Sequence, residues 1–281
     1  MNSLNRHSQA LEVELSPDSV RLRKRLLEIT KLAGRGHIGP ALSIIEIVDV
    51  LYRNVMGNPG DNQSKEWSKR DRFLLSKGHG CLGLYVVLED LGLLDGMNLS
   101  NFCSYESNFG GHPESSTVPV IEFSTGSLGH GMPVAVGLAV AAKLKKESWR
   151  VFVVVGDGEL NEGSNWEAAA HACKHNLDNL VVIVDYNNMQ ASGEVADVLE
   201  MHPLKEKWEA FGFETIEVNG HDRRELERAL TTKSSKSSPL CIVAYTVKGK
   251  GIKKAENSSV WHHKAKISAE EIDALTLDLT T

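Results

Sequence analysis

Two apolar segments that lack alternation constrain the fold of this 281-residue chain most strongly. In Val151–Gly156 five of the six residues are apolar, three of them consecutive valines, and a second apolar run, Leu180–Asp185, follows. Runs of this kind are typical of strands that are buried on both faces of a parallel sheet. The residues between them, Glu159–Asn176, are predicted to form a helix that carries the chain back to the start of the next strand.

Polar residues follow both of these runs. Asp157 lies between two glycines at the end of the first run, and Asn187 comes directly after the second. Open α/β sheets bind ligands at the carboxyl ends of their strands, so these two side chains should lie side by side. Carboxylate, amide and carbonyl oxygens are ligands that Mg²⁺ accepts, and the glycines would let an anion approach the backbone at a helix N-terminus. The sequence therefore predicts a joint site for a cation and a diphosphate.

Two simpler interpretations of Gly156-Asp157-Gly158 compete with this one. An Asp-Gly turn between a strand and a helix would explain the segment without any metal. A calcium-binding EF-hand loop would also place oxygen ligands here, but Glu162 stands where the glycine of that loop belongs and Ala168 where its bidentate glutamate belongs. A strand also precedes the loop, which argues further against an EF-hand.

The whole chain favours an α/β fold, with a mostly parallel central sheet and helices on both faces. We expect a polar tail at residues 1–16 and a single domain at 17–281, because no Pro/Gly/Ser linker separates two domains. Ser43 and Glu46 match a capping box and predict a helix start. The predicted helices are 17–33, 43–56, 79–91, 128–146, 159–176, 204–211 and 223–231, and the predicted strands are 71–76, 151–156, 180–185, 214–218 and 240–246.

Composition narrows the class of protein. A formal charge of −6 without basic runs argues against a nucleic-acid partner. The four cysteines are scattered without CxxC pairing and indicate reduced thiols. No apolar stretch approaches the length of a membrane span, and the polar N-terminus lacks the apolar core of a signal peptide. We therefore expect a cytoplasmic enzyme that binds neither nucleic acid nor membrane.

Histidines beside glycines mark the loops between the predicted elements. Glycine permits tight turns, and histidine can hold a hydroxyl or move a proton near neutral pH. A lone loop histidine is usually just a solvated residue, whereas several in such settings suggest a site. Zinc is disfavoured, because these histidines show neither HxxxH nor HxxEH spacing and are not paired with CxxC. The segments are GHIG (36–39), SKGHG (76–80), GGHPE (110–114), TGSLGHG (125–131) and WHH (261–263).

In this order, and together with GDGELNEG and DYNN, these segments resemble the N-terminal, pyrophosphate-binding half of a transketolase. The resemblance covers nearly all of residues 18–263, and the chain is similar to the N-terminal subunit of split transketolases. It implies thiamine diphosphate with Mg²⁺, for which Ca²⁺ or Mn²⁺ could substitute. It also implies transfer of a two-carbon ketol unit from a ketose phosphate to an aldose phosphate, and a separate C-terminal subunit that carries the pyrimidine-binding domain. Two copies of this chain are expected to assemble with two copies of the partner.

The resemblance also implies roles for particular residues. Metal ligands would be Asp157, Asn187 and the backbone carbonyl of Met189. Glu162 would touch the catalytic glutamate of a partner chain, while His37, His112 and His262 would line the substrate channel and assist proton transfer. The cofactor-binding residues would be His79, Gly126, Leu128, Gly156, Asp157, Gly158, Glu159 and Asn187.

Departures from the family pattern leave the substrate open. His130 replaces the usual glutamine, Pro133 a common serine and His263 a common glycine. Neutral drift explains these changes slightly better than a variant ketose or acceptor. Two other functions remain as alternatives: a subunit of another thiamine diphosphate enzyme, such as a 2-oxo acid dehydrogenase component or a relative of 1-deoxyxylulose phosphate synthase, and a non-catalytic regulatory paralogue.

Overall fold

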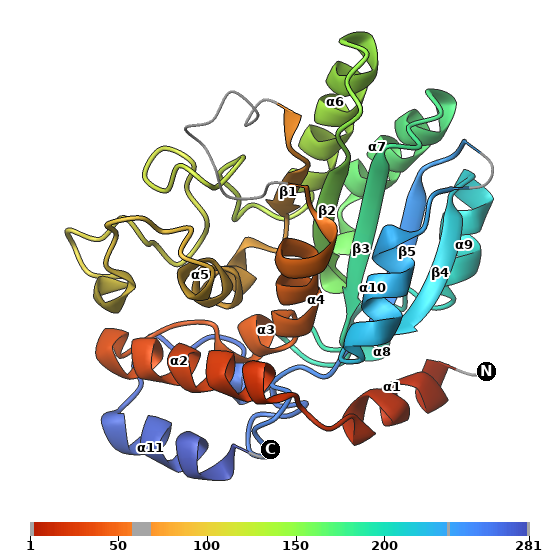
Figure 1. The fold of residues 1–281 in the computed structure, drawn as a ribbon. Coiled ribbons are helices and arrows are strands. Elements are labelled where there is room, and N and C mark those ends of the chain that lie inside the picture. The colour runs from red at the N-terminus through yellow and green to blue at the C-terminus, as the bar shows by residue number, and fades with distance from the viewer. Residues whose placement is uncertain (1–2, 58–68, 235–236, 280–281) are drawn as a thin grey trace.

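A parallel sheet organises the chain (Figure 1). The computed structural model describes residues 3–57, 69–234 and 237–279. In these residues the sheet has five strands in the order β1-β2-β3-β5-β4, and all neighbours are parallel. The predicted α/β fold is therefore confirmed. The strands are β1 Arg72–Leu75, β2 Val151–Gly156, β3 Leu180–Tyr186, β4 Glu214–Asn219 and β5 Leu240–Tyr245.

The register of the central strands aligns the two polar loops. Val151 pairs with Leu180 at one end of the β2–β3 ladder, and Gly156 pairs with Asp185 at the other. Both strands are buried along their whole length, as their unbroken apolar sequences predict. Asp157 and Asn187 consequently leave the sheet at the same edge, on neighbouring strands.

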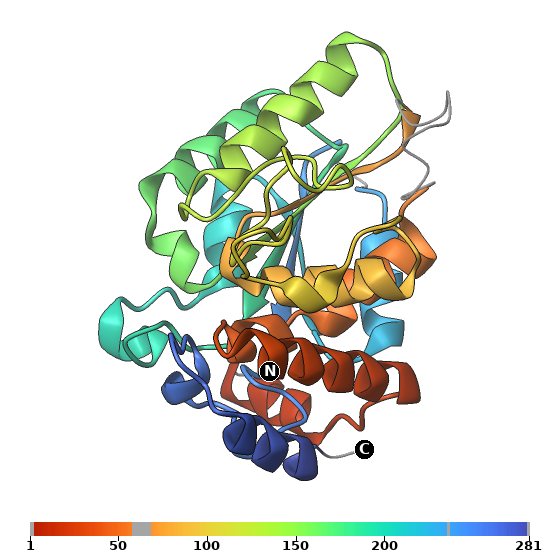
Figure 2. The same ribbon diagram turned by 90° about the vertical axis from the view of Figure 1, so that its left-hand side faces the viewer.

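Helices cover both faces of the sheet, as the two views show (Figures 1 and 2). Alternate residues of β2 explain this layering, because Phe152 and Val154 join one apolar core while Val151, Val153 and Val155 join another. The first core includes residues of α2 Pro17–Ala33, α3 Ile38–Leu42, α4 Ile45–Val50, α5 Cys81–Asp90, α10 Arg223–Thr231 and α11 Ala269–Asp278. The second includes residues of α6 Gly131–Leu144, α7 Gly163–Lys174, α8 Val195–Val198 and α9 Leu204–Phe211.

Three predicted helices have the predicted bounds, namely α2, α9 and α10. Helix α2 begins where the side chain of Ser16 accepts a hydrogen bond from Ser19 N and where Pro17 occupies its first turn. It ends at Gly34, whose φ of 63° is left-handed. Other helices start later than predicted, because short 3₁₀ turns at Gly78–Gly80 and Gly158–Asn161 precede α5 and α7. Of the described helices, none is long and apolar enough to cross a membrane.

The capping box predicted at Ser43 and Glu46 is wrong. The Ser43 hydroxyl donates to the Asp185 carboxylate at 2.8 Å, and Glu46 is ion-paired with Arg23 at 2.6 Å. Both side chains are buried, so forming bonds with buried charged groups takes precedence over capping a helix end. The continuous helix expected at 43–56 is instead α4 followed by a π-helical turn, Leu51–Val55.

A capping box does occur in α11, where the sequence reading predicted no helix. The Ser268 side chain accepts from Glu271 N, and the Glu271 side chain accepts from Ser268 N. Residues Ser3–Glu12 likewise form a helix, α1, where a polar tail was expected. This helix is anchored by His7 Nε2, which lies 2.9 Å from the carbonyl oxygen of Tyr186 at the end of β3.

The start of α6 packs directly against the end of β1. A Cβ atom added at Gly131 would lie 2.6 Å from Ser76 Cβ, a distance that real side chains do not adopt. Gly137, further along the same helix, has open space around the position of its missing Cβ. Glycine is therefore required at residue 131 for close packing but is not required at residue 137.

We expect Gly131→Ala to lower the free energy of unfolding by about 1–3 kcal/mol, the usual cost of overpacking. Gly137→Ala is the matched control and should raise the free energy of unfolding by about 0.5–1 kcal/mol, because alanine is the better helix former. Urea unfolding of the purified chains measures both values. Equal effects of the two substitutions would contradict the packing argument.

Candidate functional site

A cavity of about 300 Å³ opens at the carboxyl edge of the sheet. It gathers residues from loops that are far apart in the sequence, as the family order of the motifs suggested. Every predicted site residue except Glu162 lines it, and Pro40, Lys77, Gln190, Ala191 and Lys248 join them. The predicted residues in its wall are His37, His79, His112, Gly126, Leu128, Gly156, Asp157, Gly158, Glu159, Asn187, Met189 and His262.

The candidate metal ligands lie next to each other at the ends of β2 and β3. Asp157 accepts hydrogen bonds from the backbone N–H groups of Gly158 at 2.7 Å and Asn188 at 2.6 Å. The amide oxygen of Asn187 accepts from Met189 N at 3.1 Å. These bonds orient one carboxylate and one amide oxygen toward the cavity loop, and each oxygen retains a lone pair for a cation.

Electrostatics at Asp157 fit a bound cation. Burial, followed by the negative charge of Asp185, raises the pKa of Asp157 to about 7. A divalent cation would offset this unfavourable charge. Within residues 3–57, 69–234 and 237–279, no three His, Cys, Asp or Glu side chains converge as metal ligands. A cation here would therefore rely on one carboxylate together with amide and carbonyl oxygens, a donor set suited to Mg²⁺ that keeps water or phosphate ligands.

Beneath the cavity, the carboxylate of Asp185 is completely buried and fully hydrogen-bonded. Its Oδ2 atom accepts from Ser43 Oγ at 2.8 Å and from Asn187 Nδ2 at 2.9 Å, and forms an ion pair with Lys77. Its Oδ1 atom accepts from the hydroxyl of Thr246. Burial opposes ionisation, but Lys77 and these donors lower the pKa of Asp185. The carboxylate thus holds Asn187 in place from below.

Two lysines bring positive charge to this region. Lys77 is committed to Asp185, whereas Lys248 Nζ donates to the carbonyl oxygens of Met189 at 3.2 Å and Gln190 at 3.0 Å. Burial and the nearby Lys77 lower the pKa of Lys248 to about 8. A diphosphate would find this ammonium group and the N–H groups of the Gly156–Gly158 loop in the same cavity.

Histidine rings form a cluster over the other side of the cavity. The ring centroid of His37 lies 5.8 Å from those of His79, His112 and His262. Burial and neighbouring positive charge lower the pKa of His37 to about 4 and that of His262 to about 3. The rings are therefore neutral near pH 7, and each offers one N–H donor and one lone pair. The Nδ1 atom of His262 has no hydrogen-bond partner among the described residues.

Glycines set the position of His112. Gly126 has a φ of 152°, and a Cβ atom there would lie 3.1 Å from Cγ of His112. A Cβ at Gly78 would lie 2.9 Å from Gly126 N, so the loops around residues 78 and 126 pack backbone to backbone. Thr125 fixes this arrangement, since its hydroxyl donates to the carbonyl of Leu75 at 2.7 Å. The half-buried Leu128 follows on the same loop.

The two glutamates of this segment differ. Glu159 is buried and binds Ser76 Oγ, Gly129 N at 2.9 Å and Gly156 N at 3.1 Å, so it fastens three parts of the cavity wall. Glu162 is exposed at the N-cap of α7 and does not line the cavity. The predicted contact of Glu162 with a partner chain therefore remains a prediction.

The three departures from the family pattern lie in different places. His263 is exposed, and its ring centroid lies 4.4 Å from that of His37, at the histidine cluster. His130 is exposed as well, and its Nδ1 atom lies 3.1 Å from the Leu128 carbonyl oxygen. Pro133 is half-buried in the first turn of α6. Only His263 among them contacts a predicted channel histidine through its ring.

The sequence reading missed Lys248, Gln190 and Lys77 as cavity residues. Lys77 lies within the SKGHG segment but was given no role. Gln190 directly follows Met189, and Lys248 follows the end of β5, at the same edge of the sheet as Asp157. The rule that ligands bind at the carboxyl ends of parallel strands would have identified Lys248.

Comparison with known proteins agrees with this geometry. The family model described as transketolase, thiamine diphosphate binding domain, matches residues 19–280. One of the two named subunits of the apulose-4-phosphate transketolase of Actinobacillus succinogenes is 42% identical over 90% of this chain and 91% of its own length. A 6-deoxy-6-sulfo-D-fructose transketolase subunit of a Clostridium species is 34% identical over 95% of this chain and 97% of its own.

A solved structure, that of transketolase from Campylobacter jejuni, superposes with a TM-score of 0.80 at 32% identity. It is covered over 43% of its length by 99% of this chain. The parallel sheet and the polar cavity at its carboxyl edge define a ligand-binding α/β domain. The chain belongs to the transketolase family and comprises that family's thiamine diphosphate-binding domain.

The histidine cluster predicts a pH-dependent effect on stability. Unfolded histidine has a pKa of about 6.5, whereas the pKa of His37 is about 4 in the folded chain. Between these values the unfolded state binds a proton that the folded state excludes, so His37 destabilises the folded chain as the pH falls. We expect His37→Gln to gain stability relative to the wild type between about pH 6.5 and 4.

Urea unfolding of both chains at a series of pH values tests this expectation, because the difference between them cancels other groups that titrate in the same range. The exposed His175→Gln substitution serves as the control and leaves the cluster unchanged. A His37→Gln curve that runs parallel to the wild type would show that protonation of His37 is not excluded by folding.

Proposed function

We propose that this chain is the N-terminal subunit of a two-chain transketolase that depends on thiamine diphosphate and Mg²⁺. The enzyme transfers a two-carbon ketol unit from a ketose phosphate to an aldose phosphate. The observation that carries this proposal is the convergence of Asp157, Asn187 and the neutral histidine cluster on one cavity. Residues 17–281 would form one pyrophosphate-binding domain of a cytoplasmic enzyme.

In this proposal Asp157, Asn187 and the carbonyl of Met189 hold Mg²⁺, while His79 and the Gly156–Gly158 loop face the diphosphate. Lys248 adds a positive charge beside them. Glu159 acts by fastening the wall of the cavity, as its three hydrogen bonds suggest. When bound, thiamine diphosphate supplies the carbanion chemistry of ketol transfer.

His37, His112 and His262 would serve the substrate. A neutral imidazole can donate one hydrogen bond to a sugar hydroxyl and accept another, and it can carry a proton to or from a carbonyl oxygen that becomes an alkoxide. The unpaired Nδ1 atom of His262 supports this role, since a buried nitrogen without a partner favours binding of a polar ligand. Leu128 and Gly126 would lie beside the aminopyrimidine ring.

A second polypeptide would complete the site. Relatives of nearly the same length are named as subunits, which supports a separate partner that carries the pyrimidine-binding domain. Two copies of each chain would form the enzyme, with Glu162 at the contact between cofactor sites. The exposure of Glu162 leaves it accessible to such a partner. The net charge of −6 makes a nucleic-acid partner unfavourable.

The metal assignment predicts the behaviour of Asp157→Ala. This substitution removes the charged ligand and should abolish binding of thiamine diphosphate with Mg²⁺, while the fold is kept because the carboxylate is desolvated. Titration calorimetry and thermal unfolding measure the two effects. Asp178→Ala, which changes an exposed carboxylate paired with Lys143, is the control and should bind as the wild type does. Unchanged affinity in Asp157→Ala would contradict the assignment.

Activity should require both polypeptides. We expect no ketol transfer by the purified chain, and full transfer after addition of a separately expressed pyrimidine-binding partner. Assays with sugar phosphates and with pyruvate also separate transketolase from other thiamine diphosphate enzymes. Turnover by the single chain would refute the two-chain proposal, and decarboxylation of pyruvate without ketol transfer would assign the pair to another class.

A further inference from the structure

A fully buried loop, Thr246–Gly251, follows β5 and brings Lys248 to the cavity. Lys248 and Lys250 are only 1% and 4% exposed, which is unusual for lysine. Gly249 and Gly251 have φ values of 81° and 91°, so the backbone turns sharply after Lys248. Such a conformation needs contacts outside the loop to hold it.

Two hydrogen bonds hold the loop on either side of Lys248. On one side, Val247 N donates to Nε2 of His221 at 2.9 Å. On the other side, Arg23 Nε donates to the carbonyl oxygen of Lys250 at 2.8 Å. Both bonds involve buried side chains from elements that contribute no residue to the cavity wall. The backbone around Lys248 is therefore fixed from below the cavity.

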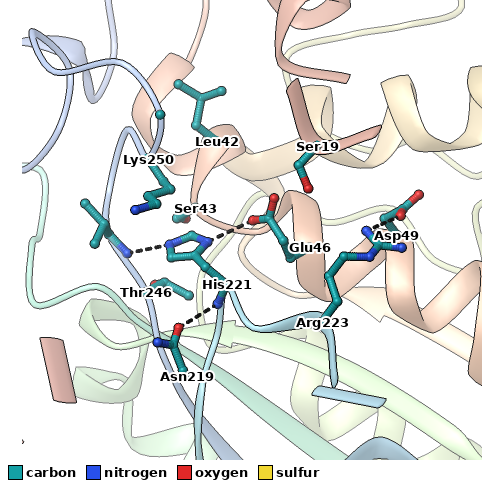
Figure 3. A network of polar contacts seen from close by, with 12 residues as sticks. Ser19, Leu42, Ser43, Glu46, Asp49, Asn219, His221, Arg223, Thr246 and Lys250 are labelled. Carbon is teal, nitrogen blue, oxygen red and sulfur yellow. Dashed lines mark hydrogen bonds and ion pairs between the residues drawn. The ribbon is translucent and has the colours of Figure 1, made fainter. Parts of the chain in front are cut away.

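Glu46 joins these two anchors into one network (Figure 3). Its Oε2 atom lies 2.8 Å from Nδ1 of His221 and 3.0 Å from Nη2 of Arg23, and its Oε1 atom lies 2.6 Å from Arg23 Nη1. The backbone of His221 is held as well, because His221 N donates to the side chain of Asn219 at 3.0 Å. None of the three charged or titratable side chains is more than 2% exposed.

This geometry defines the tautomer of His221. Val247 contributes an N–H donor, so Nε2 of the ring must be the acceptor and its proton must be on Nδ1, facing the Glu46 carboxylate. A proton on Nε2 would place two donors against each other. Burial lowers the pKa of His221, which agrees with a neutral ring.

We propose that His221, oriented by Glu46 and Arg23, is a positioning residue that sets the place of Lys248 in the cofactor cavity. The proposal rests on the function proposed above. Lys248 contacts the carbonyl oxygens of Met189 and Gln190, in the loop that carries the candidate metal ligands. If Val247 is released, the Lys248 ammonium group loses its fixed distance to this loop and to a bound diphosphate.

A pair of substitutions at His221 separates its two hydrogen bonds. Asparagine places an amide nitrogen near the position of Nδ1, so His221→Asn keeps the bond to Glu46 and loses the acceptor for Val247. Glutamine places an amide oxygen near the position of Nε2, so His221→Gln retains an acceptor for Val247. Leu177→Ala removes a buried side chain beyond the opposite edge of the sheet and controls for a general loss of stability.

Binding of inorganic pyrophosphate and of thiamine diphosphate, each with Mg²⁺, is measured on the full chain by calorimetry. We expect His221→Asn to weaken binding about tenfold, the scale of one hydrogen bond to a charged group. His221→Gln should weaken binding by less than about threefold, and Leu177→Ala should leave it unchanged. Hydrogen exchange at the Val247 amide should become faster in His221→Asn and remain slow in Leu177→Ala.

A double mutant tests whether His221 acts through Lys248. The chain with both His221→Asn and Lys248→Met should bind pyrophosphate no more weakly than Lys248→Met alone, because the positioned group is already missing. Additive losses, or equal losses in His221→Asn and His221→Gln, would overturn the positioning role. A wild-type chain that binds neither probe would overturn the proposed function and this inference with it, whereas a wild-type chain that binds no more tightly than His221→Asn would overturn only the inference.

Discussion

The buried carboxylate of Asp185 is the interaction on which the rest of the site depends. It accepts from Ser43, Asn187 and Thr246 and forms an ion pair with Lys77, so one side chain joins four segments that are distant in the sequence. Leaving an uncompensated charge at this depth would cost several kcal/mol. The four segments are therefore obliged to meet under the cavity, and the loops they carry meet above it.

Glu46 has the same role one layer further out. It binds Arg23 and His221, which in turn hold the loop that follows β5. The floor of the cavity thus rests on two buried carboxylates, each with a full set of donors. The cavity itself contains the acid with the opposite character, Asp157, whose pKa is raised because its charge lacks such compensation. Charges that maintain the fold are satisfied within the chain, whereas the charge that would bind a ligand is not.

Sequence patterns predicted the sheet and most of the cavity wall, because apolar runs and strand-end loops are local signals. The Asp157 and Asn187 loops meet for that reason. The patterns failed where distant partners decide the structure. Ser43 and Glu46 match a local capping box, but their side chains bind Asp185 and Arg23, which no local pattern reveals. The helix at Ser3–Glu12 was missed because its anchor, Tyr186, lies far along the chain. Roles carried over from the family, such as that of Glu162, need a partner before they can be examined.

The contact between Gly131 and Ser76 bears on the engineering of new substrate preferences. A library that randomises whole loops would include both positions, and most of its members would force the start of α6 away from β1. The exposed neighbours His130 and His263 have no such constraint from packing. A smaller library that fixes Gly131 and Ser76 and varies those two histidines would preserve the frame of the cavity while sampling its entrance. The absence of one methyl group thereby separates the positions that evolution in the laboratory can vary from those it must keep.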